Sequence, residues 1–346
     1  MGWTLIAIGA VSLHGAQARV HSPWEGKSPP AEHRQSYRCN PVSPPPQVIS
    51  FEGYYSDSRH SVTDPEAKRA YENASAPTEE FLRAVVNASD AYRIEGRNGA
   101  AACALRRLAS AADAKSFAQP RLAPDGSRQA FYVQTWMTAG LALAYLKVED
   151  VASAAQRKLI GRWLGALGGH VRAFQDRMSE LGSGNSRNNH HAWGGLAAAA
   201  AGIAADRRDL LAWGVQAGRD ELAQVEPTGI LPLEMARGRM ALHYHLFTAA
   251  PLVILAELAR ANGVDLYGER NEALSRLVLL TLAGTEDPSL FAAKSGSLQE
   301  IPGPNDGLIC SLLPPFERRL SKPRSSGVTG RNCAGGYAML GGTPPP

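Results

Sequence analysis

The sequence predicts an all-α protein of antiparallel helices, and two observations support this fold class. Long segments rich in alanine and leucine repeat their apolar residues at helical spacing, whereas runs with the period-two alternation of a strand are scarce. Proline, glycine and aspartate separate these segments, as expected where helices end and begin. Many helices with short connections favour helix pairs arranged as a solenoid-like stack or a closed ring, and the pattern alone leaves these two arrangements open.

The N-terminal residues precede the predicted helices. Residues 1–18 hold a short apolar core and a small-residue cleavage motif ending at Ala18, so we expect a signal peptide there. No Lys or Arg stands ahead of the apolar core, and a buried N-terminal strand is the alternative. Residues 19–50 are expected to form an extended arm, because 22–46 is rich in Pro, Ser, Arg and Gln and has no periodicity.

The first predicted helix begins at Pro77 and ends at Gly96. Glu79 and Glu80 suit its first turn, and its apolar residues then fall on one stripe. Further helices are expected at 101–112, 130–147, 151–177, 189–205, 207–225, 231–262 and 271–283. From about residue 288, Gly, Pro, Ser and Arg dominate, which predicts surface loops. We expect residues 51–346 to form a single catalytic domain.

Composition limits the class of protein and of partner. A chain of 346 residues with 44% hydrophobic content can bury a large core. Its 36 Lys and Arg against 32 Asp and Glu give a net charge of +4, which favours an anionic partner. No run of Lys and Arg alternates with aromatics, so we expect an acidic polysaccharide and no nucleic acid. No segment after the N-terminus has ~20 uninterrupted apolar residues, so we expect a soluble monomer with no membrane partner.

The four cysteines suggest an oxidising compartment. Cys39, Cys103, Cys310 and Cys333 are even in number and widely spaced, which excludes CxxC zinc and thioredoxin patterns. We expect disulfides between the first two and between the last two, in a periplasmic or secreted protein. Buried free thiols are the alternative, because spacing alone gives no connectivity.

Two short polar segments interrupt the apolar helical stretches, at residues 188–193 and 237–245. The first contains Asn189 and His190, and the second begins with Arg237. An amide, an imidazole and a guanidinium around one point would neutralise a substrate carboxylate, so that the adjacent carbon can release a proton. A helix-capping role is the alternative for the asparagines.

The second segment also supplies a phenol. Arg237 and Tyr244 are seven residues apart, so on one helix they would share a face. A nearby guanidinium lowers a phenol pKa from ~10 toward the working range, which would make Tyr244 a base or an acid. An arginine on the solvated face and a half-buried tyrosine with a satisfied hydroxyl are the alternative.

Other chemistries lack their motifs. The histidines of the two segments could bind a metal, but no HExxH pattern is present, so we expect no metal and no cofactor. No GxSxG, P-loop or GxGxxG occurs. A glycoside hydrolase needs two paired acids, and nothing in the spacing of the acidic residues, such as Glu226 and Glu234, selects a pair.

From about Cys39 to Gly342 the chain resembles the alginate lyases of polysaccharide lyase family five. The match is strongest at residues 188–193 and 231–266, and it includes Cys103. The resemblance implies an incomplete (α/α) toroid of antiparallel helix pairs. It also implies metal-independent β-elimination on a uronic acid polymer.

The resemblance assigns roles to individual residues. His190 and Asn189 would hold and neutralise the carboxylate, and His190 would be the base for one sugar epimer. Tyr244 would protonate the bridging oxygen or take the C5 proton, and Arg237 would stabilise that tyrosine and the substrate. Trp193 would be an aromatic residue in the sugar groove.

The chain departs from the family pattern around the expected groove. Leu246-Phe247 replaces Asn-Tyr, and the lysine expected near residues 52–56 is absent. The set of expected substrate contacts is Trp193, His245, Arg239, Arg331 and Tyr55. We expect polymannuronate as the first-choice polymer and polyglucuronate as the second. A non-catalytic polysaccharide-binding protein is the alternative function.

Overall fold

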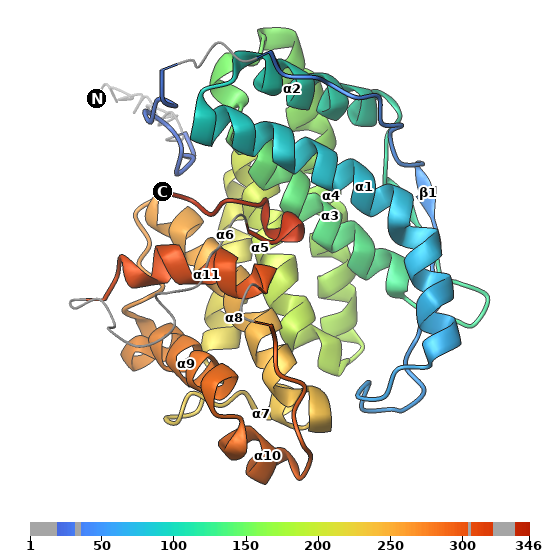
Figure 1. The fold of residues 1–346 in the computed structure, drawn as a ribbon, viewed down its shortest axis with the longest axis vertical. Coiled ribbons are helices and arrows are strands. Elements are labelled where there is room, and N and C mark those ends of the chain that lie inside the picture. The colour runs from blue at the N-terminus through green and yellow to red at the C-terminus, as the bar shows by residue number, and fades with distance from the viewer. Residues whose placement is uncertain (1–18, 32–35, 304–305, 321–335) are drawn as a thin grey trace, which may run out of the picture.

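The computed structural model describes residues 19–31, 36–303, 306–320 and 336–346 (Figure 1). The expected signal peptide over residues 1–18 lies outside this range. In the described part, strand structure is limited to the parallel pair β1 (Val48–Ile49) and β2 (Gln119–Pro120) and one isolated bridge. The predicted all-α class is confirmed.

The helices form two layers. The inner layer contains α1 (Pro65–Glu95), α3 (Gln129–Leu146), α5 (Asn189–Ala204), α8 (Ala241–Arg260) and α11 (Gly307–Glu317), each packed on the next. The outer layer contains α2 (Asn98–Asp113), α4 (Ala154–Glu180), α6 (Arg208–Leu222) and α9 (Glu269–Glu286). Each outer helix also packs on an inner helix (Figure 1). This is the expected incomplete (α/α) toroid.

Helices α3, α5 and α8 are buried on nearly all sides, as expected for apolar helices inside a core. Small residues allow the closest approach, between α5 and α6. A Cβ atom on Gly214 would lie 2.4 Å from the carbonyl oxygen of Gly195. The alanine-rich sequence of α5 therefore reflects tight helix packing rather than helix propensity alone.

The first helix begins earlier than the sequence predicted. It starts at Pro65, where the carboxylate of Asp64 accepts hydrogen bonds from the amides of Glu66 and Ala67, both at 2.9 Å. Residues 65–74 bury no side chain, so this part has no apolar stripe. Pro77 lies inside the helix instead of at its start.

Two other boundaries differ from prediction. The expected helix over 231–262 divides into α7 (Pro232–Met235), a 3-10 turn (Gly238–Met240) and α8. The expected loops after residue 288 include α10 (Ser289–Ser295) and α11, which contains Pro314 and Pro315. The apolar residues of α11 pack on α8, and this tertiary contact outweighs the cost of the prolines. Shorter 3-10 turns lie at Glu149–Val151, Gly184–Ser186 and Ala338–Leu340.

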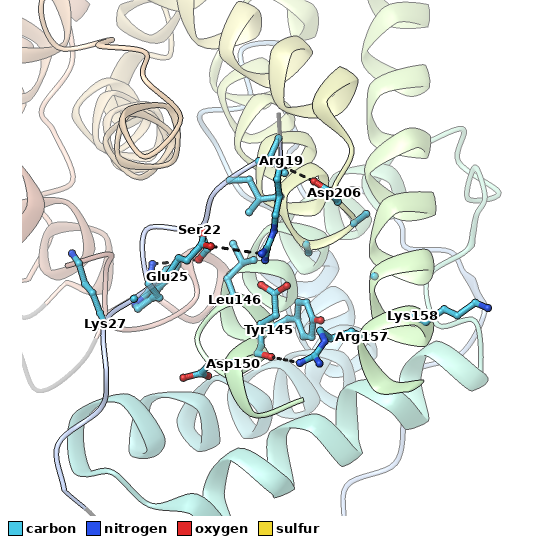
Figure 2. Close-up of a pocket in the computed structure, with 18 of the residues that line it drawn as sticks. Arg19, Ser22, Glu25, Lys27, Tyr145, Leu146, Asp150, Arg157, Lys158 and Asp206 are labelled. Carbon is cyan, nitrogen blue, oxygen red and sulfur yellow. Dashed lines mark hydrogen bonds and ion pairs between the residues drawn. The ribbon is translucent and has the colours of Figure 1, made fainter. Parts of the chain in front are cut away.

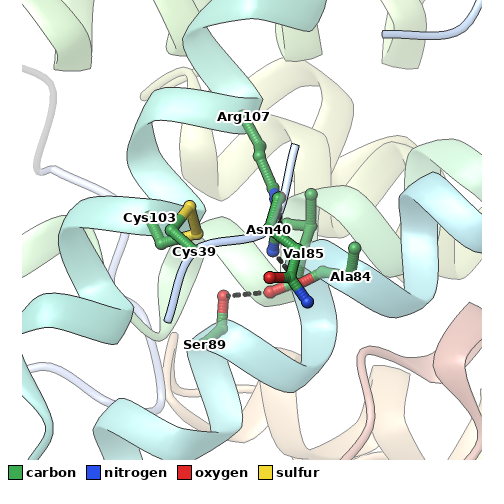
Figure 3. Close-up of a disulfide and its surroundings, with 7 residues drawn as sticks. All are labelled: Cys39, Asn40, Ala84, Val85, Ser89, Cys103 and Arg107. Carbon is green, nitrogen blue, oxygen red and sulfur yellow. Dashed lines mark hydrogen bonds between the residues drawn. A yellow bond between two sulfur atoms is a disulfide. The ribbon is translucent and has the colours of Figure 1, made fainter. Parts of the chain in front are cut away.

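A disulfide joins the extended N-terminal arm to α2. Cys39 and Cys103 are bonded as predicted, and the guanidinium of Arg107 donates to the carbonyl oxygen of Asn40 at 2.7 Å beside them (Figure 3). Cys310 is also disulfide-bonded. Its expected partner, Cys333, lies outside the described residues.

The start of the arm, residues 19–28, forms one wall of a cavity of about 780 Å³. The other walls come from the C-terminal ends of α3 and α5 and the N-terminal part of α4 (Figure 2). The amide of Val20 donates to Asp206 at 3.2 Å and fixes the arm there. We call this space the strap cavity, because residues 19–28 cross it like a strap. It lies at the end of α5 opposite to the polar segment at 188–193.

One described helical stretch, Gly238–Arg260, is long and apolar enough to span a membrane. Inside the fold, 94% of its most apolar window is buried. That burial is typical of a core helix.

We predict that replacing both Cys39 and Cys103 by serine lowers the free energy of unfolding by about 4 kcal/mol. The bond closes a loop with a sequence separation of 64, and opening it restores chain entropy to the unfolded state. Urea denaturation followed by circular dichroism measures the change. An unchanged midpoint would show that the arm contributes nothing to stability through this bond.

Candidate active site

The two polar segments lie at the N-terminal ends of inner helices. Asn188 caps α5, where its side chain accepts a hydrogen bond from the amide of His190 at 3.0 Å. Arg237 precedes the 3-10 turn before α8, so Arg237 and Tyr244 do not share one continuous helix as predicted. Their side chains nevertheless meet, because the guanidinium carbon lies 3.5 Å from the centre of the phenol ring.

Glu234 connects the two segments. One of its carboxylate oxygens accepts from the backbone amide of Asn189 at 2.6 Å and from its side-chain amide at 3.0 Å. The other oxygen lies 3.8 Å from Arg237. The amide, imidazole, guanidinium and phenol singled out from the sequence therefore gather at one place. Sequence reasoning did not select Glu234 from the other acids, because its contacts with Asn189 and Arg237 are formed only in the folded chain.

A segment near the start of the domain covers this place. The hydroxyl of Tyr55 lies 2.5 Å from the hydroxyl of Tyr244, in hydrogen-bonding contact. Arg237 donates to the carbonyl oxygen of His60 at 3.1 Å. Residues 54–63 therefore lie across the phenol and the guanidinium, and Tyr244 is only 7% exposed.

Burial controls the ionisation of Tyr244. It raises the pKa of Tyr244 to about 12, although Arg237 acts in the opposite direction. The expected shift toward the working range was wrong, because desolvation outweighs the guanidinium, which lies over the ring face. Tyr244 is therefore a neutral phenol near pH 7, which suits a proton donor better than a base.

His190 is neutral for the same reason. Burial is the main cause that lowers the pKa of His190 to about 3, and the positive charge of Arg237 adds to it. The imidazole stacks on the ring of Tyr132, with centroids 3.9 Å apart and planes inclined by 20°. The ring is thus fixed in orientation and uncharged, so it can accept a proton.

Several buried polar atoms in this region have no hydrogen-bond partner in the described part of the chain. They include Asn189 Oδ1, His190 Nδ1 and Arg237 Nε. Buried polar groups are normally paired, and unpaired ones cost free energy. Their concentration around one point is typical of a site that binds a polar ligand.

Two expected substrate contacts belong to the core instead. Trp193 is fully buried, and its indole N–H donates to the carbonyl oxygen of Phe247 at 2.9 Å. His245 is fully buried, and its Nε2 accepts from the amide of Leu231 at 3.0 Å. Both side chains face the core, so their contact with a substrate stays a prediction that this burial does not favour. Tyr132 stacks on His190, and no sequence pattern singled it out.

The remaining expected residues have different surroundings. Arg239 is exposed and forms an ion pair with Glu300 at 2.5 Å. Arg331 lies outside the described residues. Asn189 has no exposed surface, so its direct contact with a substrate stays a prediction.

Residues 50–291 match the protein family described as alginate lyase. A polysaccharide lyase of Stenotrophomonas maltophilia is 39% identical over 265 residues, which cover 76% of this chain and 78% of the relative. An alginate lyase of Azotobacter vinelandii is 33% identical over 305 residues, which cover 85% of this chain and 78% of the relative.

Among solved structures, a variant of alginate lyase A1-III complexed with a tetrasaccharide has a TM-score of 0.75 at 21% identity. The alignment covers 94% of this chain and 88% of the A1-III chain. This likeness supports the fold.

We predict that the His190 ring stays neutral down to about pH 4, because its pKa lies near 3. An ordinary histidine protonates near ~6.5. Since the unfolded chain binds this proton more readily, the contribution of His190 to stability falls between about pH 6.5 and pH 3. Ring chemical shifts in NMR, assigned with His190→Gln, measure the titration. Protonation near pH 6.5 would contradict the buried environment.

Proposed function

The chain belongs to the alginate lyase family, and from this we propose that it cleaves a mannuronate-rich alginate by metal-independent β-elimination. The reaction removes the C5 proton, breaks the bond from C4 to the bridging oxygen and leaves a 4,5-unsaturated end. It needs a group that neutralises the carboxylate, a base for the C5 proton and an acid for the leaving oxygen.

The ionisation states at the site support this division of roles. His190 is a neutral imidazole and can take the C5 proton. Tyr244 is a neutral phenol and can give its proton to the bridging oxygen as the bond to C4 breaks. Each group is therefore in the protonation state that its role requires near pH 7. The observation that carries the proposal is the position of Arg237, which lies over the ring of Tyr244 and is close enough to His190 to lower its pKa.

Arg237 supplies the positive charge. Its guanidinium keeps the Nε donor without a partner in the described residues, and its other nitrogens face His60 and Glu234. We propose that the guanidinium binds the uronate carboxylate and stabilises the negative charge that develops when C5 loses its proton. A guanidinium pairs well with a carboxylate because its N–H groups form a planar fork.

We propose polymannuronate as the preferred polymer and polyglucuronate as the second candidate. The named relatives, a polysaccharide lyase and alginate lyases, support a uronate polymer. We also propose export to the periplasm or beyond the cell, and the disulfide between Cys39 and Cys103 supports an oxidising compartment.

Incubation with alginate, polymannuronate and polyglucuronate tests the activity. We expect the ultraviolet absorbance of the unsaturated product to rise fastest with polymannuronate. Binding without any absorbance change would favour a non-catalytic polysaccharide-binding protein. New reducing ends without absorbance would indicate hydrolysis.

We predict that Tyr244→Phe lowers kcat at least about 100-fold, because it removes the acid, and leaves oligosaccharide binding largely intact. Tyr145→Phe is the matched control. Tyr145 is a buried tyrosine at the far end of α3, and its hydroxyl has no hydrogen-bond partner in the described part of the chain. Initial rates and calorimetric binding of a tetramannuronate measure both variants. Full activity of Tyr244→Phe would reject the assignment.

A further inference from the structure

We propose that Glu234 is a positioning residue for the elimination. It fixes the start of α5, which carries His190, relative to Arg237 and Tyr244, which lie before and within α8. The inference rests on the proposed lyase function. It concerns a residue that touches neither the substrate nor the reacting atoms.

The first contact of Glu234 fixes the start of α5. Asn189 is the first residue of that helix, and both its backbone and side-chain amides donate to the same carboxylate oxygen. Hydrogen bonds to a charged acceptor are about twice as strong as neutral ones. These bonds fix the backbone at Asn189, and this in turn restricts the position of the next residue, His190.

The second contact fixes Arg237. Glu234 Oε2 lies 3.8 Å from the guanidinium of Arg237, and the Arg237 side chain is only 12% exposed. The same guanidinium lies over the ring of Tyr244. One carboxylate thus contacts both Arg237, which covers the phenol, and the start of α5, which carries the imidazole. A small displacement of Glu234 would therefore change the position of the imidazole relative to the phenol. Catalysis is sensitive to displacements on the order of 1 Å.

The role depends on the groups that hold a carboxylate at this place, because burial raises the pKa of Glu234 and only these groups oppose the shift. Two amide donors, a guanidinium and the N-terminus of α5 all stabilise a carboxylate there. A second buried glutamate, Glu221 on α6, lies near enough to interact with it electrostatically.

Burial raises the pKa of both carboxyl groups. A guanidinium and both amides of Asn189 oppose this shift at Glu234, whereas only a hydrogen bond from Gln224 opposes it at Glu221. Oε1 of Glu221 has no partner among the described residues, and no ion pair to Glu221 is found there. Of the two neighbouring carboxyl groups, Glu234 is therefore the one whose contacts suit a negative charge.

The two glutamates therefore allow a matched experiment. Glutamine has the shape of a protonated glutamic acid, so Glu221→Gln should change kcat/KM by less than about twofold. Glu234→Gln keeps one oxygen that can still accept from Asn189, but it removes the negative charge and places an N–H donor toward Arg237. We expect kcat to fall about 10- to 100-fold, as when supporting partners of active-site groups are removed, with a smaller change in KM.

A double-mutant cycle separates positioning from general stability. If Glu234 acts through Asn189, Glu234→Gln should cost clearly less in an Asn189→Ala background than in the wild type. Thermal unfolding of every variant gives the change in stability independently. If Glu234→Gln does not fold, Glu234→Asp keeps the charge and takes its place in the cycle, with partial loss of kcat expected.

Three outcomes would overturn the proposal. They are equal losses in Glu234→Gln and Glu221→Gln, full additivity with Asn189→Ala, and a loss of rate that follows the loss of folded protein. A wild-type protein that produces no unsaturated ends from any of the three polymers would reject the lyase function instead. The wild-type assay thus separates the failure of the function from the failure of the positioning role.

Discussion

The close packing of α5 is the constraint on which the rest of the structure depends. Gly214 on α6 meets the backbone of α5 at Gly195, where no larger residue fits. Because α5 is enclosed by α3, α4, α6 and α8, the polar residues at its N-terminus are carried into the interior. There they need partners, and Glu234 supplies one. The composition of a core helix therefore decides where the chemistry can occur.

Exclusion of water is the physical condition that makes this place reactive. Burial pushes the pKa of His190 down and that of Tyr244 up, so both are uncharged at neutral pH. An uncharged base and an uncharged acid can each perform one proton transfer without first changing state. In the proposed mechanism the charge that neutralises the carboxylate is that of Arg237, whose side chain is only 12% exposed.

The sequence predicted what depends on local pattern and composition. Most inner and outer helices and the two polar segments follow from periodicity and residue type. The even number and wide spacing of the cysteines favoured disulfides, and the expected pair Cys39–Cys103 is bonded. Features that depend on tertiary packing were missed or wrong. The exposed start of α1 has no apolar stripe, the packing of α11 tolerates two prolines, and Trp193 faces the core. The pKa of Tyr244 was misjudged because desolvation cannot be read from neighbouring residues in the chain.

The strap cavity gives the molecule a second, independent polar region (Figure 2). It lies at the C-terminal end of α5, and the chemistry lies at the N-terminal end, roughly 24 Å away along a helix of 16 residues. Lys158, on its rim, is exposed. A dye or a resin attached to that amine would lie far from the candidate active site, so the fold offers a natural handle for immobilising the protein.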